Sequence, residues 1–153
     1  MALTLNCPAV DQHGLLRARN TCFAGGFSPP LEWSGVAAQA VTLALVLLNL
    51  DAPPQPAVHW LVFNIPAQAD ELFEAVEPDM ILDSGAKHGL NAARRPGYLP
   101  PCPAPDVTER FLFTLHALDR ALPAGPGASL QQLSPYLAAA IGRAELPFAV
   151  RSG

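Results

Sequence analysis

The sequence predicts a single domain, residues 1–153, of mainly β structure. Its 17 prolines and 11 glycines are spread along the chain, where they interrupt helices and mark turns and strand ends. Short apolar runs rich in β-branched and aromatic residues lie between these breakers. Half of the residues are apolar and 14% are charged, a composition typical of a packed core. These features favour β-strands joined by long, stiff loops.

Three segments are the strongest strand candidates, because each is short, apolar and bounded by Pro, Asn or Asp. They are VTLALVLLNL (41–50), VHWLVFNI (58–65) and RFLFTLHAL (110–118). In the third segment, large apolar side chains alternate with Thr114 and His116. This alternation is typical of a sheet that meets the core on one side. Weaker strands are predicted at LTLN (3–6) and ELPFAV (145–150).

One helix is predicted near the C-terminus. Ser134 is its candidate N-cap, Pro135 stands at the first helical position, and Gly142 is the expected stop after YLAAAI. A shorter turn is expected at SLQQL (129–133), and DELFEAV (70–76) is a candidate for a second short helix. Residues 77–109 show no periodicity, and a loop of this length usually carries function or is mobile.

Charge and hydropathy argue against several classes of protein. The net charge of −4 and the nine basic residues argue against nucleic-acid binding, which needs lysine and arginine to neutralise phosphates. The longest apolar run is far shorter than the ~20 residues needed to cross a bilayer. No basic and apolar leader is visible at the N-terminus, which makes a cytoplasmic location the working expectation.

The three cysteines, Cys7, Cys22 and Cys102, form an odd and sparse set. Their spacing resembles neither a disulfide framework nor a zinc site, and we expect reduced thiols. No metal or other cofactor is expected from these residues.

Asp51 and His59 are the first candidates for a functional site. They flank a turn in which Pro53, Pro54 and Pro56 stiffen the backbone and would fix the two side chains relative to each other. A simpler alternative is that Asp51 caps the turn through its own backbone and that His59 is an ordinary strand residue. Spacing alone favours this alternative.

Two neighbouring features extend the candidate site. Trp60 is either a core anchor or the wall of a pocket beside His59. Cys102, in the segment LPPCPAP, could serve as a nucleophile, with His59 as base and Asp51 as the group that orients it. The alternative for Cys102 is a small apolar residue held in a proline-rich loop.

Several motifs, taken together, resemble a known family. TCFAGGFSPPLEW is similar to a TCDGxxxSPPLxW opening, NLDAP to a DPDAP turn, and VHWLVFNIPA to an HWVVYNIP strand. These segments, with GLNAARRPGYLPPCP (89–103), ERFLFTLHALD (109–119) and AEL (144–146), resemble the phosphatidylethanolamine-binding protein family in its bacterial, Raf-kinase-inhibitor-like branch. The motifs occur in the family's order and cover nearly the whole chain.

The resemblance implies an antiparallel β-sandwich with a small C-terminal helical part. It also implies a pocket at one end of the sandwich for phosphate or a phosphorylethanolamine head group. Carried over position by position, the residues implied in ligand binding are Asn49, Asp51, His59, Pro101, Cys102, Pro103, Glu109 and Phe111, with Trp60 beside them.

This chain departs from the family pattern at the pocket. Asn49 replaces an acid, Leu50 a proline, Glu109 a histidine and Phe111 a tyrosine, and Leu99-Pro100 stand where the family has paired glycines. A carboxylate in place of a histidine repels an anion by about 4 kcal/mol at 4 Å for an effective dielectric near 20. We therefore expect weak phosphate binding and a better fit for an amine or a neutral polar group.

The leading hypothesis is a non-catalytic module that binds a small polar or anionic head-group-like ligand. The resemblance also implies a protein partner, such as a kinase or protease that the module inhibits, and a homodimer. One alternative is a hydrolase that uses His59 and Asp51 with water or Cys102. Another is a structural remnant whose pocket is filled by Leu99 and Phe111.

Overall fold

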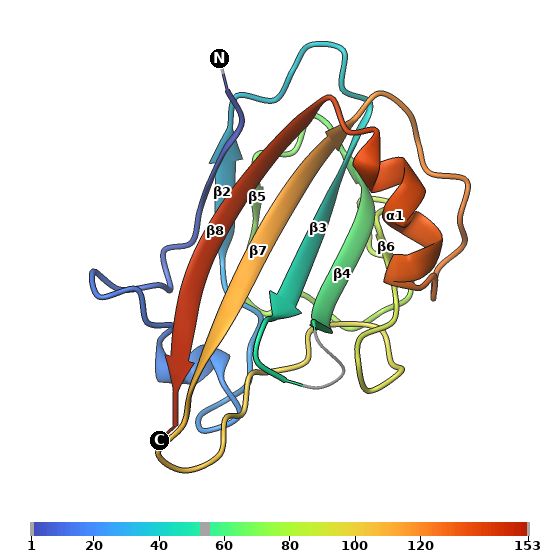
Figure 1. Cartoon of the computed structure of the whole chain (residues 1–153). Coiled ribbons are helices and arrows are strands. Elements are labelled where there is room, and N and C mark those ends of the chain that lie inside the picture. Colours follow the sequence, from blue (N-terminus) through green and yellow to red (C-terminus); the bar gives the residue numbers. More distant parts are fainter. Residues whose placement is uncertain (1, 53–55, 153) are drawn as a thin grey trace.

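In the computed structural model, which describes residues 2–52 and 56–152, the chain forms two antiparallel sheets with one α-helix on the outside (Figure 1). The larger sheet has the strand order β6-β4-β3-β7-β8 and the smaller has the order β1-β2-β5. The elements are β1 Thr4–Asn6, a 3-10 turn Ala18–Asn20, β2 Leu31–Ser34, β3 Thr42–Asn49, β4 Ala57–Pro66, β5 Glu71–Leu72, β6 Lys87–His88, β7 Thr108–Leu118, α1 Leu130–Ala138 and β8 Gly142–Arg151. The predicted β-sandwich is confirmed.

The three strongest predicted strands form the centre of the large sheet. β3 lies between β4 and β7, and its almost unbroken apolar sequence is buried on both faces. β7 pairs with β3 from Thr42↔Leu118 to Asn49↔Phe111. The weaker predictions at both ends of the chain are also confirmed, although β8 is longer than expected because it pairs with β7 over ten residues.

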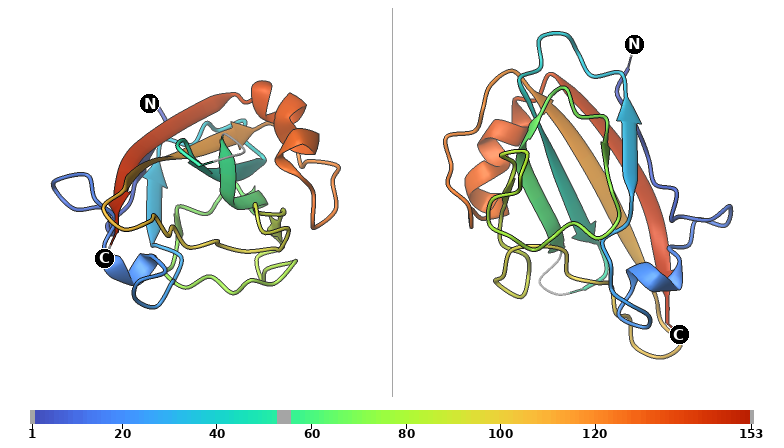
Figure 2. Two further views of the ribbon diagram at one scale, coloured as in Figure 1. Left: turned by 60° about the horizontal axis from the view of Figure 1, so that its bottom comes forward. Right: turned by 180° about the vertical axis from the view of Figure 1, so that it is seen from behind.

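The main core lies between the two sheets. Phe148 of β8 stacks on Phe111 and Phe113 of β7, with ring centroids 5.5 and 5.3 Å apart. From the small sheet, Trp33 packs into the same cluster and donates its indole N–H to the Ala69 carbonyl at 2.8 Å. Figure 2 shows the small sheet and the long loops covering one face of the large sheet.

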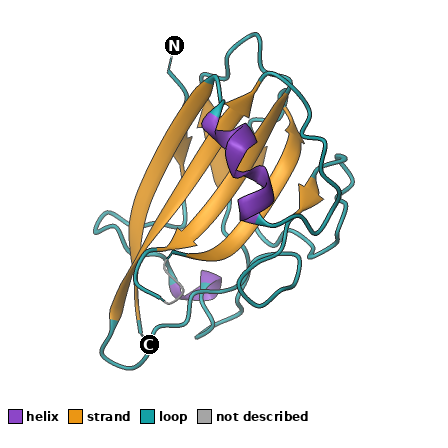
Figure 3. Cartoon of the chain, turned by 45° about the vertical axis from the view of Figure 1, so that its right-hand side comes forward, coloured by secondary structure: helices purple, strands orange, loops and turns teal. Residues whose placement is uncertain are grey.

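The opposite face of the large sheet carries α1 (Figure 3). Leu133 and Leu137 of α1 belong to a second buried cluster with Leu61 and Phe63 of β4. The prediction of a one-sided core for β7 is therefore wrong where the second cluster covers this face. Thr114 and His116 are only 4% and 7% exposed. No helix in residues 2–52 and 56–152 is long and apolar enough to cross a membrane.

The predicted start of the helix is also wrong. Ser129, not Ser134, is the N-cap: its hydroxyl accepts from the Gln132 N–H at 3.1 Å, and the Gln132 side chain accepts from the Ser129 N–H at 2.9 Å. This capping box satisfies two N–H groups at the helix start. Pro135 therefore lies inside the helix, and Gly142 begins β8.

The candidate helix at 70–76 does not form. Glu71 and Leu72 pair with β2 instead, and the Asp70 carbonyl accepts from the Trp33 N–H at 2.9 Å. Ala75 has a φ of 67°, which ends any helical path. Residues 77–107 form turns and the two-residue strand β6, in agreement with the predicted long loop, but β7 begins at Thr108 and takes up the last two residues of that predicted loop.

Candidate functional site

Four of the predicted site residues, Asn49, Asp51, His59 and Phe111, come together at one end of the large sheet, where β3 ends and β4 and β7 begin. Asn49 is paired with Phe111 on one side and with Ala57 on the other. His59 meets the Phe111 ring edge to face, with centroids 5.0 Å apart. Leu47 pairs with Trp60 and Leu48 with Val58, so His59 is the extra residue of a β-bulge. Pro53 and Pro54, expected to stiffen the turn, lie outside the described residues.

Asn49 and Asp51 hold the turn and the first residues of β7. The Asn49 side-chain carbonyl accepts from the Asp51 N–H at 2.9 Å, so Asn49, rather than Asp51, closes the turn through its side chain. The Asp51 carboxylate accepts from the Arg110 backbone N–H at 2.7 Å and from its guanidinium at 2.6 Å. Hydrogen bonds from Arg110 hold the pKa of the Asp51 carboxyl below its ordinary value.

His59 is fixed by a reciprocal pair of hydrogen bonds to Leu99. The Leu99 N–H donates to the His59 carbonyl at 2.7 Å, and the His59 Nδ1 lies 2.8 Å from the Leu99 carbonyl oxygen. Because a carbonyl oxygen only accepts, Nδ1 carries a proton. Burial lowers the pKa of His59, and the Leu99 carbonyl and the charge of Glu109 partly offset this effect. At neutral pH, Nε2 is therefore the unprotonated nitrogen.

The proline-rich loop is tied down by a disulfide. Cys102 is bonded to Cys22, 80 residues away, with a Cα–Cα distance of 5.3 Å. The expectation of reduced thiols is therefore wrong for this pair, although Cys7 is free and buried. The two cysteines meet because the turn at Thr21 and the loop near Pro101 run side by side. Their spacing along the sequence does not indicate this proximity. Pro101 and Pro103 are buried and Cys102 is exposed.

The remaining predicted residues differ widely in exposure. Phe111 and Trp60 are fully buried, Asn49 is 2% exposed and His59 is 8% exposed, whereas Glu109 is partly exposed. Trp60 donates its indole N–H to Nε2 of His88 at 3.0 Å. Trp60 is thus a core residue. Phe111 is likewise a core residue, because its ring stacks on Phe148.

The arrangement that a hydrolase would need is not formed. Asp51 bonds to Arg110, and His59 Nδ1 bonds to the Leu99 carbonyl, so the carboxylate does not orient the imidazole. Cys102, held in a disulfide, has no thiol to act as a nucleophile. The sequence does not predict that Arg110 pairs with Asp51 or that the backbone of Leu99 bonds to His59. Leu99 acts through its backbone, which no residue type could have indicated.

A family model described as phosphatidylethanolamine-binding protein matches residues 6–150. The chain belongs to this family. Among curated proteins, a UPF0098 protein of Methanothermobacter thermautotrophicus is 38% identical over 131 residues, which cover 86% of each chain.

Two solved structures of phosphatidylethanolamine-binding protein homologues are similar throughout. The homologue CT736 of Chlamydia trachomatis has a TM-score of 0.88 and 31% identity, covering 99% of each chain. YbcL of E. coli, described as a member of the mammalian family, has a TM-score of 0.89 and 25% identity, covering 100% of each chain. The predicted family is confirmed.

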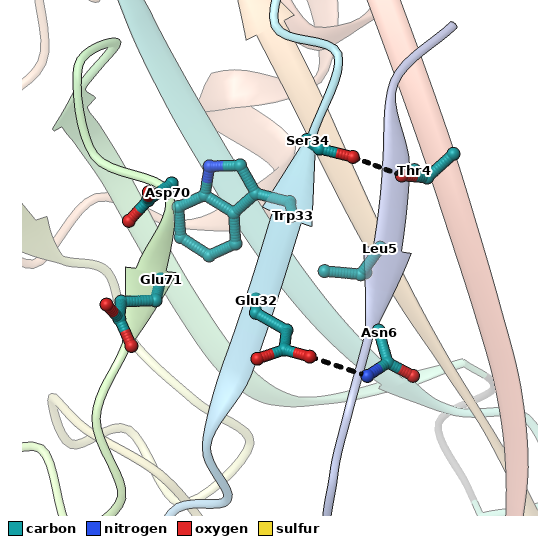
Figure 4. Close-up of a pocket in the computed structure, with 8 residues that line it drawn as sticks. All are labelled: Thr4, Leu5, Asn6, Glu32, Trp33, Ser34, Asp70 and Glu71. Atoms are coloured by element: carbon teal, nitrogen blue, oxygen red, sulfur yellow. Dashed lines mark hydrogen bonds between the residues drawn. The ribbon is translucent and has the colours of Figure 1, made fainter.

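A shallow groove elsewhere in this phosphatidylethanolamine-binding protein homologue runs across the small sheet (Figure 4). Glu32 accepts from the Asn6 side chain at 2.9 Å, and Thr4 and Ser34 share a hydrogen bond of 2.8 Å. Glu32 also lies opposite Glu71 in the strand register. In the described ranges, 2–52 and 56–152, no group of three or more His, Cys, Asp or Glu residues is placed to hold a metal ion.

Proposed function

We propose that this protein is a non-catalytic binding module whose site takes small ligands through hydrogen-bond donors, such as an ammonium or hydroxyl group. Family membership supports a small-ligand site. The observation that carries the chemical class of ligand is the bond between His59 Nδ1 and the Leu99 carbonyl, at 2.8 Å. Because that bond fixes the proton on Nδ1, a neutral His59 offers a lone pair at Nε2.

The charge around His59 supports the same class of ligand. Glu109 lies on β7 close enough for its carboxylate to act on the pKa of His59. Asp51 is neutralised by its ion pair with Arg110, at 2.6 Å. In the described part of the chain, Glu109 has no ion-pair partner. The net charge of these groups is therefore negative, and it attracts an ammonium group and repels a phosphate.

The proposal extends to partners and location. A kinase or protease as protein partner, a homodimer and the absence of turnover are supported only by analogy with the family. A cytoplasmic location remains a prediction. The Cys22–Cys102 disulfide argues against it, since disulfides persist mainly in oxidising compartments.

Calorimetric titration with ethanolamine, inorganic phosphate and phosphorylethanolamine tests the ligand class. We expect ethanolamine to bind and inorganic phosphate to bind weakly or not at all. Glu109→His should reverse this order, because it replaces a carboxylate by a group that can donate a hydrogen bond. Glu71→Gln, which removes an exposed carboxylate on the small sheet, is the matched control and should change neither affinity.

The pH dependence gives a second, independent check. Below the lowered pKa of His59, Nε2 gains a proton and becomes a donor, so acidification should weaken ethanolamine binding and strengthen phosphate binding. Tighter binding of phosphate than of ethanolamine at neutral pH would contradict the proposal. No binding of any of the three ligands, with His59→Ala equally inert, would support the closed structural remnant instead.

A further inference from the structure

The loop that follows Leu99 has few attachments of its own. Residues 100–103 are Pro-Pro-Cys-Pro, and proline has no N–H group to donate. In the described ranges, this stretch makes one backbone hydrogen bond, from the Cys22 N–H to the Pro101 carbonyl at 3.0 Å. Apart from the packing of its buried prolines, that bond and the Cys22–Cys102 disulfide attach it to the molecule.

The disulfide joins two residues at the surface. Cys22 and Cys102 are both exposed, whereas the third cysteine, Cys7, is 3% exposed. Burial raises the pKa of the Cys7 thiol and keeps it in its unreactive form. Exposed disulfides are the ones that exchange with external thiolates, because exchange needs access to a sulfur atom.

The disulfide also lies close to the groups that orient His59. Cys102 is three residues from Leu99, whose N–H and carbonyl both bond to His59, at 2.7 and 2.8 Å. Asn20, two residues before Cys22, accepts a hydrogen bond at its carbonyl from the hydroxyl of Tyr98, the residue before Leu99, at 2.7 Å. Freeing the loop at Cys102 therefore loosens the carbonyl that fixes the tautomer of His59.

We propose that Cys22–Cys102 is a site of thiol–disulfide exchange with a dithiol reductant, and that its redox state controls the hydrogen bonding of His59. A thiolate of the reductant attacks one sulfur of the pair, the Cys22–Cys102 bond breaks, and a mixed disulfide forms. The second thiol of the reductant then attacks that mixed disulfide. Two electrons and two protons pass to Cys22 and Cys102, which become thiols, while the reductant becomes a disulfide.

The ligand-binding consequence rests on the proposed function, whereas the exchange itself and its effect on His59 do not. Oxidised protein keeps Nδ1 of His59 on the Leu99 carbonyl and Nε2 as an acceptor. In reduced protein, the released loop no longer enforces that tautomer, so the site loses its fixed acceptor. Reduction should weaken the binding of a donor ligand.

Alkylation after mild reduction tests the exchange on the full chain. Folded protein is treated with dithiothreitol, then with iodoacetamide, and the modified cysteines are located by mass spectrometry while circular dichroism monitors the fold. We expect Cys22 and Cys102 to be alkylated and Cys7 to stay unmodified. If the pair becomes reactive only under conditions that also unfold the chain, the proposal is wrong.

The histidine ring protons report the effect on His59 without any ligand. We expect the titration of His59 by NMR to differ between oxidised and reduced protein, while those of His88 and His116 stay the same. The double variant Cys22→Ser with Cys102→Ser should reproduce the reduced protein even if reduction is slow. Cys7→Ser is the matched control. Identical His59 titrations in the oxidised protein and the double variant would overturn the proposal.

Ethanolamine titration of the same samples separates the two proposals. We expect its affinity to fall by about fivefold or more on reduction, the low end of coupling between two sites. Unchanged ethanolamine affinity together with unchanged His59 titration would overturn the redox control and leave the proposed function standing. A changed His59 titration with no ethanolamine binding in either state would overturn the proposed function and leave the redox control standing.

Discussion

Acidification should destabilise this protein through His116, which lies on the outer face of β7. Its side chain is 7% exposed, and its Nε2 lies 3.0 Å from the Thr114 hydroxyl. In the described part of the chain, its buried Nδ1 has no hydrogen-bond partner. Burial, with a smaller effect of the Arg143 charge, lowers the pKa of His116 to about 4.

The sign and size of the effect follow from this shift. Because the pKa is lower in the folded chain, the unfolded chain binds the proton first as the pH falls below the ordinary value of 6.5. The free energy of unfolding therefore decreases between pH 6.5 and about 4 and levels off below that range. Since one pKa unit corresponds to about 1.4 kcal/mol, the full loss from His116 is about 3 kcal/mol.

The variant His116→Leu isolates this contribution. At pH 7 we expect a small change in stability, because an apolar side chain removes an unpaired buried nitrogen while leaving the Thr114 hydroxyl without its partner. From pH 7 to pH 4, the variant should lose about 3 kcal/mol less than the natural protein. Urea unfolding followed by tryptophan fluorescence, with the disulfide intact, measures both values. His13→Leu, at an exposed position, is the control.

Equal losses in the natural protein and in His116→Leu would refute the reasoning, because they would show that His116 titrates at the same pH folded and unfolded. An increase in stability on acidification, removed by the substitution, would be a sharper contradiction. It would mean that the charged imidazole has a partner in the folded chain.

Three further changes probe the packing around the site and the helix. His88→Leu should cost about 1–3 kcal/mol in urea unfolding, because it leaves the buried Trp60 N–H without its acceptor. Ser129→Ala should cost about 1 kcal/mol by the same assay, through loss of the helix N-cap. Gly35→Ala should lower the melting temperature more than Gly85→Ala does. Both glycines have a positive φ, +83° and +92°, so the backbone strain is similar. A Cβ at Gly35 would meet backbone atoms, whereas a Cβ at Gly85 would meet none.

The large sheet could be predicted because its strands depend on apolar pattern and chain breakers. β3, β4 and β7 are long enough for that pattern to be unambiguous. β5 could not be predicted, because a two-residue strand has no periodicity and forms only when β2 offers it an edge. The helix start was misjudged because Pro135 suggested a first turn, whereas the capping box at Ser129 determines it.

The site was predictable as a set of side chains but not as a network. Asp51 and His59 were singled out, yet the groups that hold them are Arg110 and the backbone of Leu99. The role of a backbone carbonyl cannot be predicted from residue types, because every residue has one. The bulge at His59 and the pairing of Cys22 with Cys102 are likewise properties of the folded chain.

One backbone oxygen is common to the proposed function and the proposed redox control. The Leu99 carbonyl accepts a hydrogen bond from Nδ1–H of His59, which leaves Nε2 as an acceptor at neutral pH. Under the proposed function, an acceptor near Glu109 favours ligands with hydrogen-bond donors, and the class of ligand then depends on where this oxygen lies. We propose that its position depends in turn on the proline-rich loop that the Cys22–Cys102 bond holds. A substitution that moves the loop without touching His59, Glu109 or Asp51 should therefore alter which ligands bind, even though every side chain of the site is intact.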